Sequence, residues 1–456
     1  MALIPLNQKF HTIENSVVTQ ERGSALVNSQ KEIFVTQDII DTVSAYVGLG
    51  GTQYVFVAAN GTDVQNAAEL QAAYVTAQGM SPSITNRITV IAAPGNYDFS
   101  TANFVMSTQY IDLVSLDGNK SIVFNGSNTI EITANDVFVR GVDVGTLSFT
   151  IANSLNLLRV EDCRGGYASF GGAGSIASGT FTNCTGGDES FGGVGTASGT
   201  FNSCTGAMFS FGSSTADGTF TNCTGGDQSF GGDAGTASGT FTNCTGGTDS
   251  FGGGGGTASG TFTDCTGVYG SFGSGNLADG VFNNCTGGDE SFGGVGTASG
   301  TFNSCTGGDG SFGGDGGTAS GTFNSCIGGF ASFGGQGGTA DGTFTNCTGG
   351  NRSFGSNTAS GTFTNCTGGD QSFGGNNLAS GVFNSCIGGD DSFGGDGGTA
   401  SGVFNSCIGG NQSFGGNGTL SGFLYYCRLT SGAFATPTGG GKITLGINGS
   451  NAIITT

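Results

Sequence analysis

The pattern of apolar and polar residues in the second half of the chain repeats about every 20 residues. In residues 197–202, alanine, glycine and phenylalanine alternate with serine, threonine and asparagine. Such alternation is typical of a strand with one buried face, so we expect Ala197, Gly199 and Phe201 to face inwards. Cys204 lies three residues after Phe201, and it can face inwards too only if the backbone turns between them.

The spacing within the repeat separates fixed segments from one variable segment. One cysteine occurs per repeat from Cys163 to Cys427, and successive cysteines are 19, 20 or 21 residues apart. The phenylalanine of the next Ser-Phe-Gly always follows 7 residues after the cysteine, whereas the distance from there to the following alanine ranges from 5 to 7 residues. Loops tolerate changes in length and paired strands do not, so the variable segment predicts a loop at one corner.

Self-similarity at this period predicts a solenoid in which each repeat stacks on its neighbours. We expect an all-β fold, a right-handed parallel β-helix with coils of about 20 residues and an N-terminal capping helix. Stacking in register would place equivalent side chains above one another in the core. The expected core ladder contains Cys184, Cys204, Cys223, Cys244, Cys265, Phe181, Phe191, Phe201, Phe211 and Phe220.

The region before the regular repeats predicts a helix among strands. Residues 64–78 place Ala67, Leu70, Ala73, Tyr74 and Ala77 on one face of a helix, with Asp63 as the expected N-cap and Gly79 as its end. Strands are expected at 54–59, 88–93, 111–116, 121–124, 129–133, 137–139 and 155–160. We therefore divide the chain into an N-terminal segment (1–47), a capping helix with irregular first coils (48–162), regular repeats (163–430) and a C-terminal cap (431–456).

The amino-acid composition bears on which kinds of partner the chain can bind. The 456 residues include 94 glycines and carry a formal net charge of −21, and Arg352 is the one basic residue between Gly165 and Cys427. This charge disfavours nucleic acid as a partner. Without an 18-residue apolar span or an N-terminal signal-like run, we expect no membrane insertion and assembly in a cytosol. One cysteine per coil favours buried thiols over a disulfide framework.

Acidic residues are the first candidates for chemistry, because paired carboxylates cleave polysaccharides. Those in the repeats recur with the period and therefore predict a solvated acidic corner, with calcium binding as an alternative: Asp188, Glu189, Asp227, Asp289, Glu290, Asp309, Asp370, Asp390 and Asp391. A catalytic groove in the irregular coils stays open, and its candidates are Asp98, Asp112, Glu131, Asp136 and Asp143. We assign no catalytic, cofactor-binding or metal-binding residue, and no cofactor.

Three other patterns resemble known functional motifs. Threonines flank the inward phenylalanine in many repeats, as Thr240 and Thr242 do, and they resemble the flat face of ice-binding solenoids; Val281, Val382 and Val403 interrupt this array. Asn-Cys-Thr sequences match glycosylation sequons, but we interpret their asparagines as corner residues in a hydrogen-bonded ladder. Residues 440–442 (Gly-Gly-Lys) lack the rest of a phosphate-binding loop and predict a closing turn.

Two stretches resemble known protein families. Residues 22–26 (Arg-Gly-Ser-Ala-Leu) and 36–43 (Thr-Gln-Asp-Ile-Ile-Asp-Thr-Val) resemble an N-terminal stretch of structural proteins from tailed bacteriophages, cyanophages especially. The helix, the strand at 88–93 and Pro94-Gly95-Asn96-Tyr97 resemble the start of pectate-lyase-like right-handed β-helices.

The first resemblance implies that residues 1–47 attach the chain to other virion proteins. The expected function is that of a structural virion protein, assembled in the host cytoplasm, which forms a rigid fibre or spike and contacts a host surface glycan. A homotrimer is expected by analogy. The alternatives are a polysaccharide depolymerase tailspike, since many tailspikes with this fold cleave polysaccharide, and an ice- or glycan-binding adhesin.

Overall fold

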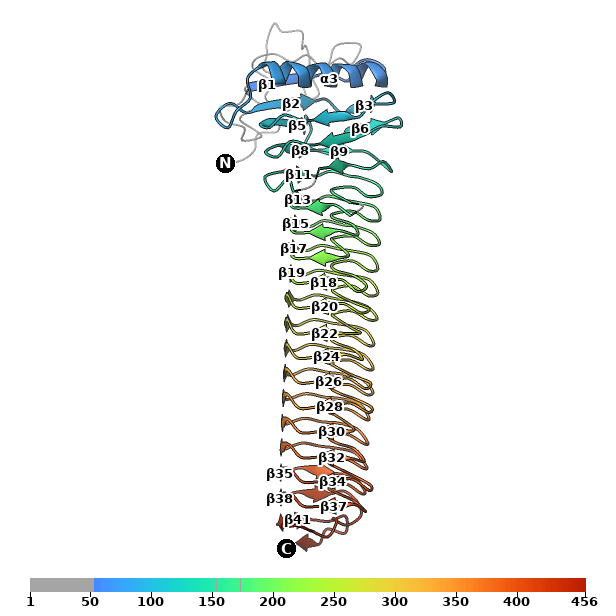
Figure 1. Cartoon of the computed structure of the whole chain (residues 1–456), viewed down its shortest axis with the longest axis vertical. Helices are drawn as coiled ribbons and strands as arrows, with labels where there is room; N and C mark the ends of the chain where they lie inside the picture. Colours follow the sequence, from blue (N-terminus) through green and yellow to red (C-terminus); the bar gives the residue numbers. More distant parts are fainter. Residues whose placement is uncertain (1–52, 153, 173) are drawn as a thin grey trace, which may run out of the picture. The chain divides into compact units, whose positions relative to one another are not determined.

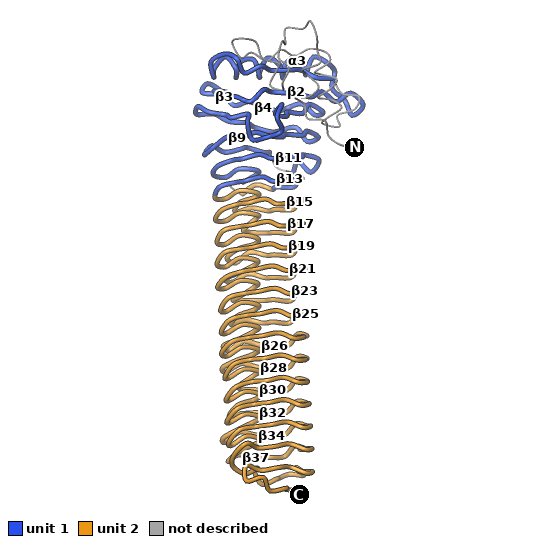
Figure 2. Tube along the Cα trace, turned by 180° about the vertical axis from the view of Figure 1, so that it is seen from behind, with its two compact units in different colours: residues 1–171, 177–187 blue, residues 172–176, 188–456 orange. Residues whose placement is uncertain are grey.

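The computed structural model describes residues 53–152, 154–172 and 174–456. Figure 1 shows the chain, and Figure 2 shows that these residues divide into two compact units. Unit 1 contains the described residues up to Gly171 together with residues 177–187, and unit 2 contains those of 172–176 and 188–456. The attachment segment expected at residues 1–47 lies outside the described residues.

Unit 1 contains the helix α3 (Asp63–Gly79). Its N-cap is Thr62, whose side chain accepts a hydrogen bond from the Gln65 backbone, while the Gln65 side chain accepts one from the Thr62 N–H. The prediction of Asp63 as the cap was therefore wrong, because this reciprocal capping box satisfies two backbone donors and places Asp63 in the first turn. The five residues expected on the apolar face are all buried, and so is Asn66.

Three parallel sheets build most of the rest of unit 1. The first sheet consists of β1 (Gln53–Val57), β2 (Ile88–Ala92), β5 (Ile111–Ser115), β8 (Phe138–Arg140), β11 (Arg159–Glu161) and β13 (Thr180–Thr182). The second consists of β3 (Gly95–Asp98), β6 (Ile122–Asn125) and β9 (Val142–Asp143). The third consists of β4 (Phe104–Met106), β7 (Ile130–Ile132) and β10 (Thr150–Ile151).

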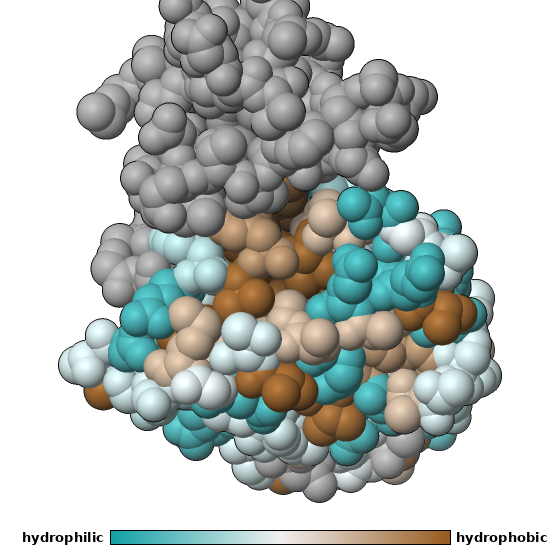
Figure 3. All heavy atoms as spheres, turned by 90° about the horizontal axis from the view of Figure 1, so that it is seen from above, coloured by the Kyte–Doolittle hydropathy of each residue, from teal (hydrophilic) through white to brown (hydrophobic). Residues whose placement is uncertain are grey.

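Pro94 bends the chain after β2, and Gly95 begins β3 and pairs with Ile122 of β6. The strand expected at 155–160 begins later, at Arg159. Helix α3 packs against β1, β2 and β3. Viewed onto the α3 end, the surface mixes apolar and polar side chains (Figure 3).

Each regular coil of unit 2 has a three-residue strand whose central residue faces the core. These strands are β15 (Thr200–Asn202), β17 (Thr219–Thr221), β19 (Thr240–Thr242), β21 (Thr261–Thr263), β23 (Val281–Asn283), β25 (Thr301–Asn303), β27 (Thr322–Asn324), β29 (Thr343–Thr345), β31 (Thr362–Thr364), β33 (Val382–Asn384), β35 (Val403–Asn405), β38 (Phe423–Tyr425) and β40 (Lys442–Thr444).

A two-residue strand precedes most of them. These short strands are β14 (Thr196–Ala197), β16 (Thr215–Ala216), β18 (Thr236–Ala237), β20 (Thr257–Ala258), β22 (Leu277–Ala278), β24 (Thr297–Ala298), β26 (Thr318–Ala319), β28 (Thr339–Ala340), β30 (Thr358–Ala359), β32 (Leu378–Ala379), β34 (Thr399–Ala400) and β37 (Thr419–Leu420); β12 (Ile176–Ala177) spans the division between the units. The third side of the coil has single bridges such as Thr205 to Thr224, and then β36 (Ile408–Gly409), β39 (Arg428–Leu429) and β41 (Gly446–Ile447).

All of these strands pair in parallel and in register with the next coil. Phe201 is the partner of Phe220, which is 19 residues away, and Phe220 is the partner of Phe241, 21 residues further on. The structure is therefore a β-solenoid of stacked parallel coils, which confirms the predicted fold class; the right hand of the coils stays a prediction.

Buried columns of identical side chains fill unit 2. Cysteine, alanine and two phenylalanines recur in each coil with essentially no exposed surface, and all ten residues of the expected ladder are buried. Within each phenylalanine column neighbouring ring centroids are 4.7–4.9 Å apart and nearly parallel, as for Phe191 with Phe211 and Phe230 with Phe251. Rings of the two columns meet edge to face, as Phe220 and Phe230 do at 5.5 Å, which is a favoured aromatic geometry.

The backbone reaches this packing through left-handed residues in every coil. In one coil Ser203, Phe209 and Phe211 have φ of 53°, 57° and 56°. The turn at Ser203 lets Phe201 and Cys204 both face inwards, and asparagine, aspartate or serine takes the Ser203 position in the other coils up to Cys407 because these short polar residues tolerate this conformation. The left-handed phenylalanine of Ser-Phe-Gly was not predicted, since such residues rarely adopt positive φ.

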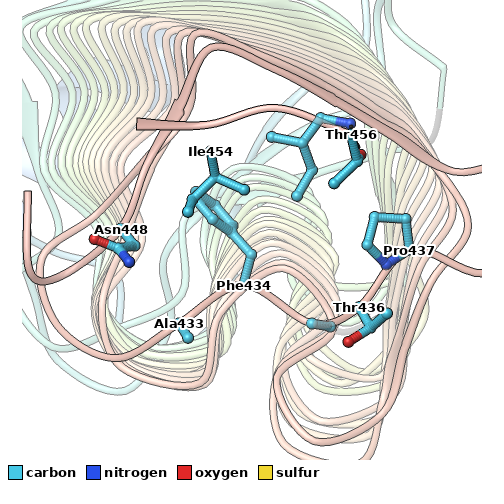
Figure 4. A pocket seen from close by; sticks show the side chains of 9 residues that line it. Ala433, Phe434, Thr436, Pro437, Asn448, Ile454 and Thr456 are labelled. Carbon is cyan, nitrogen blue, oxygen red and sulfur yellow. Dashed lines mark hydrogen bonds between the residues drawn. The ribbon is translucent and has the colours of Figure 1, made fainter. Parts of the chain in front are cut away.

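The edge of the last long strand is covered. Ile443 in β40 donates its N–H to the Thr456 Oγ1 and accepts a hydrogen bond from the Thr456 N–H, both at 3.0 Å. The strand β42 (Ile453–Ile454) pairs antiparallel with β41. A hollow of about 210 Å³ lies beside β42 (Figure 4). The ring of Phe434, which lines this hollow, is tilted by 47° from the ring of Phe414. Covered edges do not template further strands.

We predict that Gly260→Ala destabilises unit 2 and that Gly255→Ala does not. A Cβ at Gly260 would lie 2.3 Å from the Gly239 carbonyl oxygen of the neighbouring coil, whereas a Cβ at Gly255 meets nothing within 4 Å. Because close-packed coils cannot separate locally, we expect a loss of about 3 kcal/mol or more for Gly260→Ala and under about 0.5 kcal/mol for Gly255→Ala. Chemical unfolding followed by circular dichroism would measure both; equal stability of the two variants would contradict the packing argument.

Candidate functional site

The acidic corner, which we define as the residue four positions after each cysteine, connects neighbouring coils. The Asp227 Oδ1 accepts a hydrogen bond of 2.8 Å from the backbone N–H of Thr248, the equivalent residue of the next coil. The same bond joins Asp188 to Met208, Asp289 to Asp309, Asp309 to Phe330, Asp370 to Asp390, and Asp390 to Asn411. The carboxylates that the sequence placed on a solvated corner therefore also satisfy backbone donors.

The hydrogen bond between neighbouring coils requires an oxygen acceptor at the corner, but it does not require a negative charge. At Asn351 the side-chain amide oxygen accepts the same bond, 3.0 Å long, from the Asp370 N–H. Glu189, Glu290 and Asp391 occupy the next position, where the backbone N–H donates to the neighbouring coil. Within the described ranges, no group of three or more His, Cys, Asp or Glu side chains is arranged to hold a metal ion.

We predict that Asp390→Ala destabilises unit 2 by about 1 kcal/mol, since the N–H of Asn411 loses its acceptor. Asp390→Asn keeps an acceptor. Burial and the charge of Asp396 raise the pKa of Asp391, and the charge of Asp390 adds to them, so removal of that charge should leave the stability of Asp390→Asn equal to or above that of the parent protein. Thermal unfolding of both variants at neutral pH is the measurement. If both variants lost the same amount of stability, the lost negative charge, and not the lost hydrogen-bond acceptor, would be the cause.

Two of the candidate acids in the irregular coils belong to an ion-pair network in unit 1. Arg87 makes a bidentate contact with the buried Asp112, with both distances 2.8 Å, and a third contact of 2.8 Å with Asp136. Asp112 also accepts the backbone N–H of Phe138. The hydrogen bond to Asp112 outweighs the effect of burial and raises the pKa of Arg87 further. The two carboxylates thus share one guanidinium, a geometry that stabilises the coil stack.

The other three acids are separate from that network. The Asp98 Oδ1 accepts hydrogen bonds from the Ser100 N–H and hydroxyl, Glu131 accepts a long one of 3.5 Å from Asn103, and Asp143 accepts the Gly145 N–H. Asp98 lines a shallow hollow of about 210 Å³ beside α3, where Asp98 is the one carboxylate among the lining residues.

The threonines form in-register columns on the outside of unit 2. Thr200, Thr219, Thr240 and Thr261 are successive partners on one side of the inward phenylalanine, and Val281 follows them. A second column, from Thr205 to Thr306, pairs through single bridges on another side of the coil. The asparagines before the cysteines hydrogen-bond between coils as expected: Asn243 donates to Asn222 at 3.2 Å.

All 14 cysteines are buried free thiols. Their sulfurs lie close to backbone carbonyl oxygens, as Cys223 Sγ does at 3.3 Å from the oxygen of Phe201. Burial raises the pKa of the Cys163 thiol well above its usual value. Contact with the Cys244 thiol, followed by burial, raises the pKa of Cys265 from 9.0 to about 12. The Cys163 and Cys265 thiols are therefore protonated at neutral pH, and all 14 buried cysteines fill space in the core as small, largely apolar side chains.

Three comparisons with known proteins, against family models, curated sequences and solved structures, returned no match. Nothing in them links the chain to a virion protein. Within the described residues, no helix is both long and apolar enough to cross a bilayer. The fold thus rests on the structure itself, whereas the phage origin and the host contact stay predictions.

We predict that the thiols are unreactive in the folded protein and that alkali destabilises it. The raised pKa of Cys265 keeps its thiol protonated when folded, whereas the unfolded thiol ionises above about pH 9. Its stabilising contribution is therefore complete below pH 9 and is lost as the pH rises towards 12. Ellman titration at pH 8 with and without denaturant, together with unfolding at pH 7 to 11, would measure this; rapid reaction of folded thiols would contradict it.

Proposed function

We propose that this chain is a structural virion protein of a tailed phage, a rigid fibre or spike without catalytic activity, whose residues 1–47 attach it to other virion proteins. The observation that carries the proposal is the unbroken register of unit 2. From β15 to β38 each long strand pairs with the next through all three residues. A column held at every coil resists bending and keeps its ends at a fixed separation.

The surface of unit 2 supports a passive role. Its corner carboxylates are engaged with backbone N–H groups, and its thiols are buried. The net charge of −21 disfavours lateral clumping of such columns. We propose a virion location after assembly in the host cytoplasm, a host surface glycan as contact partner, and a right-handed, trimeric β-helix by analogy with phage spikes.

The proposal predicts that antibodies raised against residues 188–456 label an appendage of purified phage particles in electron micrographs. Pre-incubation of the antibody with the recombinant protein should abolish the label, and this serves as the control. Sedimentation of the recombinant chain should give a trimer. Label confined to soluble host fractions, with no particle labelled, would overturn the virion role; a monomer in sedimentation would overturn the trimer alone.

A second candidate, an ice-binding surface, is favoured by the in-register threonine column from Thr200 to Thr261. Threonines stacked at the interstrand spacing give a regular array of hydroxyl and methyl groups. Thermal hysteresis of the purified protein tests this candidate, and its loss on substitution of Thr240 by lysine would support it. Absence of hysteresis would remove the candidate and leave the spike proposal untouched.

A further inference from the structure

Three exposed apolar side chains, which we call the knobs, replace the usual residue at the acidic corner. They are Met208, Tyr269 and Phe330, and their numbers differ by 61 at each step, so a knob occurs in every third coil from Met208 to Phe330, and the later corners of unit 2 have none. Their side chains are 43%, 46% and 43% exposed. Each knob alone looks like an exception to the acidic corner, so these residues were not predicted as a group; the equal intervals between them are the signal in the sequence.

The spacing of the knobs limits what could contact them together. Equivalent rings in successive coils are about 4.8 Å apart, so three coils separate neighbouring knobs by about 14 Å. One ring or one side chain cannot touch two knobs. An extended polymer that follows the column could touch all three, and between the knobs it would pass the acidic corners Asp227, Asp289 and Asp309.

The charge of the residues around the knobs indicates which class of polymer could bind there. From Asp188 to Asn351 the sequence contains no lysine, arginine or histidine. Burial is the main cause of the raised pKa of Asp249, and the charges of Asp233, Asp227 and Glu290 add to it. With acidic corners and no basic residue, this stretch of unit 2 has a negative potential. Such a potential repels anionic polymers and a second copy of this acidic chain, and it attracts cations.

The molecule itself contains an example of a cation on a knob. The guanidinium of Arg352, in the coil after Phe330, lies 5.8 Å from the centre of the Phe330 ring and hydrogen-bonds to Gln371 and Gln336. At Tyr269 the corresponding position in the next coil is Glu290, whose carboxylate accepts the Tyr269 hydroxyl at 2.7 Å. An aromatic face and a carboxylate therefore lie side by side there, which is the combination that binds guanidinium and ammonium groups.

We propose that the knob edge of unit 2, formed by Met208, Tyr269 and Phe330 with the acidic corners between them, binds an extended basic polypeptide segment. Arginine or lysine side chains of the partner contact the ring of Tyr269 and the neighbouring carboxylates, and aliphatic parts of the partner cover Met208 and the part of Phe330 that Arg352 leaves exposed. This function goes beyond that of a rigid spacer and does not depend on the virion role.

The test compares binding of one peptide to variants of equal charge. The probe is a fluorescent peptide of about 20 residues with alternating arginine and glycine, followed by anisotropy at about 0.15 M salt. Met208→Thr, Tyr269→Thr and Phe330→Thr are combined, because threonine already occupies this corner at Thr248 and the net charge does not change. We expect the full chain to bind the peptide and the triple variant to bind about tenfold more weakly.

The matched control is Val194→Thr with Val295→Thr, which removes two exposed apolar side chains at a different corner of unit 2 and should leave binding unchanged. Unfolding midpoints of all variants should agree with that of the parent chain. Absence of peptide binding by the parent chain would overturn the proposal. Equal binding by the parent chain and the triple variant would also overturn it, because the negative charge of the chain alone would then explain the binding. Knob-dependent binding of neutral dextran in place of the peptide would also overturn it, in favour of a glycan.

Discussion

Backbone hydrogen bonding between coils sets one distance, and the rest of the structure has to conform to it. Successive strands of a parallel sheet lie about 4.8 Å apart, and the phenylalanine rings of unit 2 repeat at 4.7–4.9 Å. A side chain that recurs in each coil must therefore pack against its own copies. Flat rings stack in this geometry, small thiols and methyl groups fill the remaining space, and a Cβ on Gly260 would collide with the coil below. The low diversity of the sequence follows from this distance.

The polar groups obey the same constraint. A corner turns the backbone away from the sheet, so its N–H groups need partners other than a regular ladder. In unit 2 the carboxylate or amide oxygen of a corner residue supplies that partner to the next coil, as Asp227 does for Thr248 and Asn351 does for Asp370. These corner residues are thus explained by the need for an oxygen acceptor, and their negative charge is a secondary consequence of that need.

The sequence predicted the repetitive part of the fold well, and the reasons are physical. Constant spacing from Phe201 to Cys204 fixes which side chains stack, because a change of one residue would move them to the other face. The spacing could not show that the phenylalanine of Ser-Phe-Gly adopts positive φ, since no residue preference indicates it. It also could not assign the corner hydrogen bonds, which depend on where the next coil places its N–H. At α3 the expected cap was Asp63, and only the reciprocal bonds between Thr62 and Gln65 show that Thr62 takes this position.

The interchangeable coils of unit 2 have a consequence for the length of the molecule. Each interior coil presents nearly the same two surfaces, phenylalanine, cysteine and alanine, to the coil before and the coil after it. Removal or duplication of one whole period would therefore join surfaces that already match, and the column would shorten or lengthen by a single interstrand step. Unequal recombination between near-identical gene segments generates such changes, so the reach of the protein is adjustable in small increments while every interior contact is kept.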